Sequence, residues 1–264
     1  MDRWPRTDLH LHATHYRLKG ARPEMTVANI LHRLESEGYV TAGIVEHLDT
    51  NPKHPLSCLE ALVAEFRAVA SARPSSLNVY VGAELDYQGN AISIPDAPAI
   101  KERLGLDYCL GGVHGLGEGV TSALALIEDH HRRLMGIAAC PYVDVVVHPW
   151  CGGHSYARRG RIEGWRFEWI PERYLVELID AARQSGKAIE LNTKVLDDID
   201  DPAFQHYLGL LRASGVPVTV GSDAHSIERV GSVDPLNALL RDAGFGPERL
   251  WRPDTRCVPN PTPS

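Results

Sequence analysis

Short apolar, β-branched runs alternate with longer amphipathic segments along most of the chain. Runs of strand length occur at residues 7–12, 43–47, 79–85, 108–113, 143–148, 188–192 and 217–222. Apolar residues at helical spacing occur at residues 26–38, 57–72, 121–139, 171–186, 201–215 and 234–244. Ser57, with Glu60 three residues later, is typical of a capped helix start. The pattern predicts seven strands, most of them separated by helices.

Repeated strand–helix alternation is typical of a parallel sheet covered by helices. About seven such units, with no break in composition, favour one closed or nearly closed α/β barrel over two domains. We therefore expect a single domain over residues 1–264. Residues 89–98 and 151–170 are expected to be loops, and residues 253–264 a flexible tail.

Composition narrows the classes of partner and compartment. The 264 residues are 44% hydrophobic and 23% charged, as is ordinary for a globular protein. A net charge of -7 disfavours nucleic acid as the main partner, but it leaves a small phosphorylated substrate open. Five cysteines without a CxxC pair favour a reducing compartment. No apolar run has signal-peptide or membrane-span length, so we expect a cytoplasmic protein without a membrane partner.

The stretch RTDLHLHATH, residues 6–15, concentrates imidazoles near the start of the chain. In a strand, Asp8, His10 and His12 project to one face and the two leucines to the other. Two imidazoles on one face at a strand end suit a metal ion. Taken alone, the stretch also fits a half-exposed strand that carries two incidental histidines.

Metal-capable side chains end almost every predicted strand. In parallel α/β barrels the carboxyl ends of the strands open onto one face, so these side chains are expected to meet there. Singly, each has an ordinary structural explanation, but together they favour a metal site: His10, His12, His47, Glu84, His114, His148, Asp223 and His225. Glu190 and Asn192 end the sixth strand at the same level.

The other histidines of helices and loops are expected to be structural or surface residues. Four fall within predicted helices, where we place them on polar faces: His32, His130, His131 and His206. Two fall in predicted loops, where a surface position is favoured: His54 and His154.

The ordered motifs DLHLH, EH, GAE, GGVH, HP and SDAH resemble those of the PHP (polymerase and histidinol phosphatase) family. The resemblance runs from Asp8 to about Gly244. It implies a distorted (β/α)7 TIM-like barrel that holds two or three divalent ions, commonly zinc, manganese or iron. It also implies phosphoester hydrolysis.

Carried over residue by residue, the resemblance implies three ion positions. One ion would be held by four residues, His10, His12, Glu84 and Asp223. Glu84 would bridge to a second ion, held also by His114 and His148. A third ion would be held by His47 and His225.

Two positions depart from the family pattern. The trinuclear phosphatases carry a further histidine six residues after the HxH pair, where this chain has Leu18. The nearest substitute is His15, which a loop would have to bring to the third ion. Glu46 stands before His47, where many relatives have aspartate.

The expected chemistry is hydrolysis of a small phosphoester. Divalent ions lower the pKa of a shared water and offset phosphoryl charge, and Glu84 as a bridging ligand fixes their separation. Asp223 or His225 is placed to assist proton transfer to the leaving alkoxide. Arg158, in the long loop after His148, and Lys194, just past the sixth strand, are the first candidates for phosphate binding.

Histidinol phosphate is the leading candidate substrate, with nucleotides and phosphodiesters as alternatives. Amidohydrolases and TatD-like nucleases also begin with HxH. However, the usual binuclear amidohydrolase needs a lysine at the end of strand four, where this chain has GGVHG. A non-catalytic PHP module is a further alternative, but such modules have usually lost ligands that this chain retains.

Overall fold

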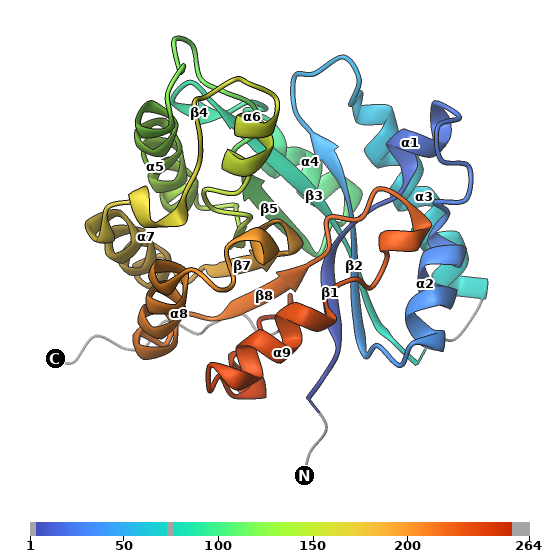
Figure 1. The fold of residues 1–264 in the computed structure, drawn as a ribbon. Coiled ribbons are helices and arrows are strands. Elements are labelled where there is room, and N and C mark those ends of the chain that lie inside the picture. The colour runs from blue at the N-terminus through green and yellow to red at the C-terminus, as the bar shows by residue number, and fades with distance from the viewer. Residues whose placement is uncertain (1–3, 73–75, 255–264) are drawn as a thin grey trace, which may run out of the picture.

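The computed structural model describes residues 4–72 and 76–254 and contains a nearly closed barrel wrapped by helices (Figure 1). Its parallel strands are β1 (Thr7–His12), β2 (Thr41–Leu48), β3 (Asn78–Gln88), β5 (Tyr108–Gly112), β6 (Val145–Val146), β7 (Ala188–Asn192) and β8 (Val218–Gly221). A short strand, β4 (Ala91–Ile92), pairs antiparallel with β3. The helices are α1 (Thr14–Leu18), α2 (Val27–Ser36), α3 (Leu56–Ala72), α4 (Ala97–Leu104), α5 (Ala123–Ala139), α6 (Gly153–Arg158), α7 (Glu172–Gln184), α8 (Pro202–Ser214) and α9 (Asp234–Asp242).

The seven described parallel strands are ordered β1-β2-β3-β5-β6-β7-β8, which confirms the predicted barrel class. The segment after β8 returns to β1 and narrows the remaining gap. There, the Asp223 amide donates to the His10 carbonyl at 2.8 Å, and the His12 amide donates to the Ala224 carbonyl at 3.0 Å. The two ends of the sheet therefore meet at the residues that were expected to bind metal.

The barrel interior is filled from opposite walls. One cluster combines Leu9, Val45, Leu110 and Val145, which come from strands around the barrel, with Tyr108. A β carbon added at Gly43 would lie 2.2 Å from the Tyr108 hydroxyl, so only glycine leaves room for that ring. This apolar plug closes the barrel below the polar residues at the strand ends.

The start of β1 departs from simple alternation. Its register against β2 shifts between Asp8 and Leu11. As a result, Leu9 joins the interior cluster, whereas Leu11 joins the larger core between sheet and helices. The prediction that both leucines share one face is wrong, because a bulge changes the side to which a strand residue points. His10 and His12 both remain fully buried.

Several helices differ from the predicted pattern. The short helices α1, α4 and α6 lie where the sequence suggested loops or nothing regular, because one or two turns give too few residues to show a period. Helix α3 begins at Leu56, so Ser57 lies inside it, and Glu60 pairs with Arg103 at 3.0 Å rather than capping.

His130 is buried at 2% exposure, which contradicts its predicted position on a polar face. It lies four residues after Leu126 and four before Leu134, on the apolar side of α5. Burial lowers its pKa to about 3, so the ring is neutral. The spacing from both leucines indicates that His130 lies on the apolar side. The prediction treated it together with the adjacent His131, which is more exposed.

Strand β6 is shorter than expected, since only Val145 and Val146 pair with both neighbouring strands. Most of the predicted tail, residues 255–264, lies outside the described residues. No helix of the described chain is long and apolar enough to cross a membrane.

Candidate metal centre

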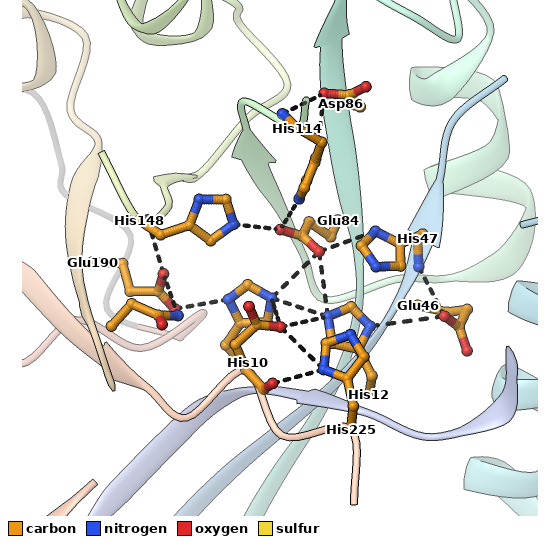
Figure 2. A network of polar contacts seen from close by, with 12 residues as sticks. His10, His12, Glu46, His47, Glu84, Asp86, His114, His148, Glu190 and His225 are labelled. Atoms are coloured by element: carbon orange, nitrogen blue, oxygen red, sulfur yellow. Dashed lines mark hydrogen bonds and ion pairs between the residues drawn. The ribbon is translucent and has the colours of Figure 1, made fainter. Parts of the chain in front are cut away.

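Four donor atoms from distant parts of the chain converge at the carboxyl end of the barrel. His10 Nε2 and His12 Nε2 lie 3.1 Å apart (Figure 2). Glu84 Oε2 is 3.4 Å and 3.3 Å from these two nitrogens. Asp223 Oδ1 is 3.7 Å and 3.3 Å from the same pair. The structure therefore brings together all four residues that the family resemblance assigns to one ion.

The other carboxylate oxygen of Glu84 faces a second pair of imidazoles. Its Oε1 lies 3.0 Å from His114 Nε2 and 2.9 Å from His148 Nε2 (Figure 2). The Glu84 side chain is 1% exposed, and the parallel pairing of β2 with β3 places Glu84 opposite His47. Glu84 thus stands between two sets of nitrogen donors, in the arrangement of a bridging ligand.

Attraction between carboxylates and imidazoles sets the charges in this cluster. Burial raises the pKa of Glu84, but His114, His10 and His47 outweigh it and hold the pKa well below its usual value. Burial lowers the pKa of His225 to about 4, so this ring is neutral near pH 7. The cluster therefore combines ionised carboxylate with both charged and neutral imidazole.

Several buried nitrogen and oxygen atoms of the cluster, each able to bind a metal ion, have no hydrogen-bond partner among the described residues. These are Glu84 Oε2, His12 Nδ1 and His47 Nδ1. The separations of 3.1–3.7 Å within the first donor set compare with about 3.3 Å between ligands of a tetrahedral zinc site. Mixed imidazole and carboxylate donors suit zinc, manganese or iron. The cluster fits divalent ions, and its donor triplets include His10–His12–Asp223, His47–Glu84–His114 and His12–His47–His225.

Glu190 contacts two histidines of the cluster, His10 and His148, through its two carboxylate oxygens. Its Oε1 lies 2.8 Å from His10 Nδ1, and its Oε2 accepts from the His148 backbone amide at 3.0 Å. A carboxylate on one ring nitrogen orients the other nitrogen toward a metal. Sequence analysis placed Glu190 at this level of the barrel but gave it no role.

Two further carboxylates accept hydrogen bonds from the backbone amides of nearby histidines. Glu46 accepts from the backbone amides of His15 at 2.6 Å and His47 at 3.1 Å. Asp86 Oδ1 lies 3.2 Å from His114 Nδ1 and accepts from the backbone amide of that residue at 3.0 Å. Sequence analysis missed Asp86, although its position two residues beyond Glu84 on β3 is a usable signal.

The third donor set gathers His47 and His225 around His12. The ring centroid of His12 lies 4.5 Å from the centroids of both other rings. His225 Nδ1 lies 2.7 Å from the Asp223 carbonyl oxygen and donates a hydrogen bond to it, which leaves the lone pair of Nε2 to bind an ion or accept a proton. The resemblance assigns His47 and His225 to a third ion, and the centroids of these two rings lie 6.3 Å apart.

His15 lies beside this set rather than in it. Its ring packs edge-on against His54, with centroids 4.6 Å apart, and its Nδ1 is buried without a partner among the described residues. Leu18 is 57% exposed at the end of α1. His54 is half-buried and stacks on His47 at 4.3 Å, which contradicts the predicted surface position.

The backbone bends sharply at two of the expected ligands. Asp223 has φ 51° and His148 has φ 34°, both in the left-handed region that non-glycine residues seldom adopt. Each follows the last paired residue of its strand by two residues. Such conformations cost about 1–3 kcal/mol, so surrounding contacts must hold them, as is common at functional sites.

The two predicted phosphate-binding residues lie in different surroundings. Lys194 Nζ forms an ion pair with Asp223 Oδ2, and Lys194 lines a cavity of ≈ 300 Å³ over the cluster. Arg158 is 66% exposed and pairs with Asp197 at 3.1 Å, so the structure does not bring it to the cluster. Arg229 lines the cavity instead. Sequence analysis did not single it out, although it follows SDAH by only four residues.

Gly221, the last residue of β8, leaves space that the metal centre needs. A β carbon there would lie 2.0 Å from Glu190 Oε1 and 2.6 Å from His10 Cβ. We expect Gly221→Ala to displace both side chains, destabilise the fold by about 1–3 kcal/mol and weaken zinc binding about 10–100-fold. Thermal unfolding and competition with a chromogenic chelator measure the two effects.

Gly209→Ala is the matched control, because Gly209 lies in α8 and a β carbon there meets nothing within 4 Å. Replacing this helical glycine with alanine should stabilise the fold slightly and leave zinc binding unchanged. Equal zinc affinity in Gly221→Ala and the unaltered protein would show that the Glu190–His10 contact does not support the centre.

Fold and cluster together define an α/β-barrel protein with a candidate multinuclear metal centre. No protein-family model matches the chain. A probable phosphatase from Caldicellulosiruptor bescii is 28% identical over 208 residues, covering 76% of this chain and 75% of that protein. A probable phosphatase from Acetivibrio thermocellus is 23% identical over 160 residues, covering 60% of this chain and 56% of that protein.

A solved structure has the same fold. Histidinol phosphate phosphatase from Lactococcus lactis, crystallised with zinc, L-histidinol and phosphate, superposes with a TM-score of 0.65. The two chains are 16% identical, and the alignment covers 91% of this chain and 94% of the other. The solved structure confirms the barrel fold, and the names of the two relatives agree with the predicted phosphatase class of hydrolase.

Proposed function

We propose that this protein is a metal-dependent phosphatase that hydrolyses small phosphomonoesters. The observation that carries the proposal is the position of Glu84, whose two oxygens face two separate imidazole sets within 3.4 Å. The first set would hold one ion with Asp223, and His114 with His148 would hold a second. A third ion would bind His47 and His225.

When bound, these ions activate water and offset the charge that develops on the phosphoryl group. Lys194 binds a phosphoryl oxygen, since it lines the cavity beside Asp223. Although burial lowers the pKa of Lys194, Asp223 raises it, so the ammonium stays charged at neutral pH. With no third ion bound, the unprotonated Nε2 of His225 would accept a proton from the attacking water and return it to the departing alkoxide.

Histidinol phosphate is the first substrate to test, because a phosphatase of this fold was crystallised with L-histidinol and phosphate. Purified protein is stripped with a chelator, reloaded with zinc or manganese and assayed for phosphate release from a panel of phosphomonoesters. We expect release to require metal and to rise at least about a hundredfold on reloading.

The same experiment tests the alternatives. Turnover of a phosphodiester but no monoester would assign a phosphodiesterase. Less than about one ion per chain, together with no turnover of any ester after reloading, would contradict an enzymatic function and support a structural module.

A further inference from the structure

Two cavities beside the metal centre share lining residues. The first, of ≈ 300 Å³, lies over the cluster and reaches Lys194 and Arg229. The second has ≈ 360 Å³, and it shares His225 and Arg229 with the first. Its remaining lining residues are Tyr16, Ala21, Arg22 and Ser226. A phosphoryl group in the first cavity would therefore direct its leaving group along Arg229 into the second.

The second cavity carries two guanidinium groups with unused donors. Among the described residues, Arg22 donates only to the carbonyl of its neighbour Ala21, at 3.4 Å. Within the described ranges, the side chain of Arg229 donates only to Thr193 Oγ1, at 3.3 Å. No lining residue of this cavity is acidic. The nearby Glu228 interacts electrostatically with Arg22, but it is fully exposed and does not line the cavity.

A third cavity, of ≈ 520 Å³, also borders His114, but its guanidinium groups are already paired. Asp129 pairs with both Arg132, at 2.7 Å, and Arg133. Arg132 also donates to Asn90 Oδ1 at 2.7 Å. These guanidinium groups serve the local structure, whereas those of the second cavity remain available to a ligand.

We infer that the second cavity binds the leaving group and selects phosphomonoesters whose leaving group carries its own negative charge. This inference rests on the proposed phosphatase function. Planar guanidinium groups pair with carboxylate or phosphate through two parallel hydrogen bonds, so Arg22 and Arg229 suit either anion. A leaving group with a protonated amine, such as that of histidinol phosphate, meets two cations and no acidic lining residue.

Three small esters that differ in leaving-group charge test the inference. The leaving group carries a carboxylate in 3-phosphoglycerate, no charge in glycerol 3-phosphate and an ammonium in O-phosphoethanolamine. With zinc-loaded protein at low salt, kcat/KM should fall in that order. The ratio of kcat/KM for 3-phosphoglycerate to kcat/KM for glycerol 3-phosphate should drop about fivefold in Arg22→Gln and in Arg229→Gln. A change of this size corresponds to the loss of one exposed charge pair. Higher ionic strength should reduce the ratio in the unaltered protein.

Arg183→Gln is the matched control. Arg183 is an exposed arginine of α7 that pairs with Asp180 at 2.8 Å, and its loss should leave the ratio unchanged. Phosphate release that is fastest from O-phosphoethanolamine, or a ratio unaffected by both substitutions, would overturn the inference and leave the phosphatase function standing. No release from any ester would instead overturn the phosphatase function, and the inference with it.

Discussion

Replacing Glu84 with glutamine should abolish turnover, with a loss on the order of a thousandfold in kcat/KM. The amide keeps the shape of the side chain but removes the charge and turns one acceptor into a donor. Because both oxygens face imidazole nitrogens within 3.4 Å, the change weakens both ion positions at once. Metal analysis by plasma mass spectrometry should therefore show fewer ions per chain, alongside the kinetic loss.

A surface carboxylate that also contacts a histidine provides the control. Glu177 is 51% exposed and lies 2.7 Å from His131, so Glu177→Gln removes a comparable contact away from the centre. It should retain full metal content and activity. Undiminished metal and turnover in Glu84→Gln would rule out a bridging carboxylate at this position.

Residues at strand ends were the most predictable part of the centre. Glu84 and His148 lie more than sixty positions apart in the chain, yet their side-chain atoms approach to 2.9 Å. Apolar runs mark the strands, and parallel strands in a barrel end on one face, so the chain order alone places these residues together. Only the positions of the strands, and not their exact lengths, had to be correct.

Residues outside the strands were less predictable, because the path of a loop depends on tertiary contacts. Arg158 and Arg229 both follow strand-end ligands, and sequence spacing does not distinguish them. In the structure, α6 carries Arg158 to an exposed pair with Asp197, while the turn after SDAH brings Arg229 to the cavity. His15 was predicted at the third ion because it lies close to His12 in the chain, but in the structure its ring packs against His54.

The supporting carboxylates show a different limit. Glu190 and Asp86 lie within the last three residues of β7 and β3, so the sequence marks their level in the barrel but not whether they face an ion or an imidazole. That distinction depends on side-chain distances, such as the 2.8 Å between Glu190 Oε1 and His10 Nδ1. Local spacing carries no such information.

Zinc affinity at the His10–His12 position should fall about tenfold for each pH unit between pH 9 and pH 7. Burial lowers the pKa of His10, but Glu190 and Glu84 outweigh it and raise the pKa to about 10. The pKa of His12 is likewise raised well above 6.5, against the effect of burial, by Asp223, Glu46 and Glu84. The closely spaced His10–His12 pair therefore holds a proton in the metal-free protein, and an entering ion must displace it.

Competition titrations with a chelator of known affinity, repeated at several pH values, measure this slope. A pH indicator in weakly buffered solution should report the released protons directly. His225 should add nothing, because its pKa of about 4 leaves it neutral throughout this range. An affinity independent of pH would contradict protonation of the His10–His12 pair in the metal-free state.

The same protonation predicts opposite trends for the stability of the two forms. A histidine whose folded pKa is raised to about 10 stabilises the metal-free protein fully below its ordinary value of 6.5, and this contribution is lost as pH rises toward 10. Metal binding strengthens over the same range, because fewer protons must leave. The difference in Tm between zinc-loaded and chelator-treated protein should therefore widen from pH 6.5 to pH 9. A difference that narrows would mean that these imidazoles are neutral before the metal arrives.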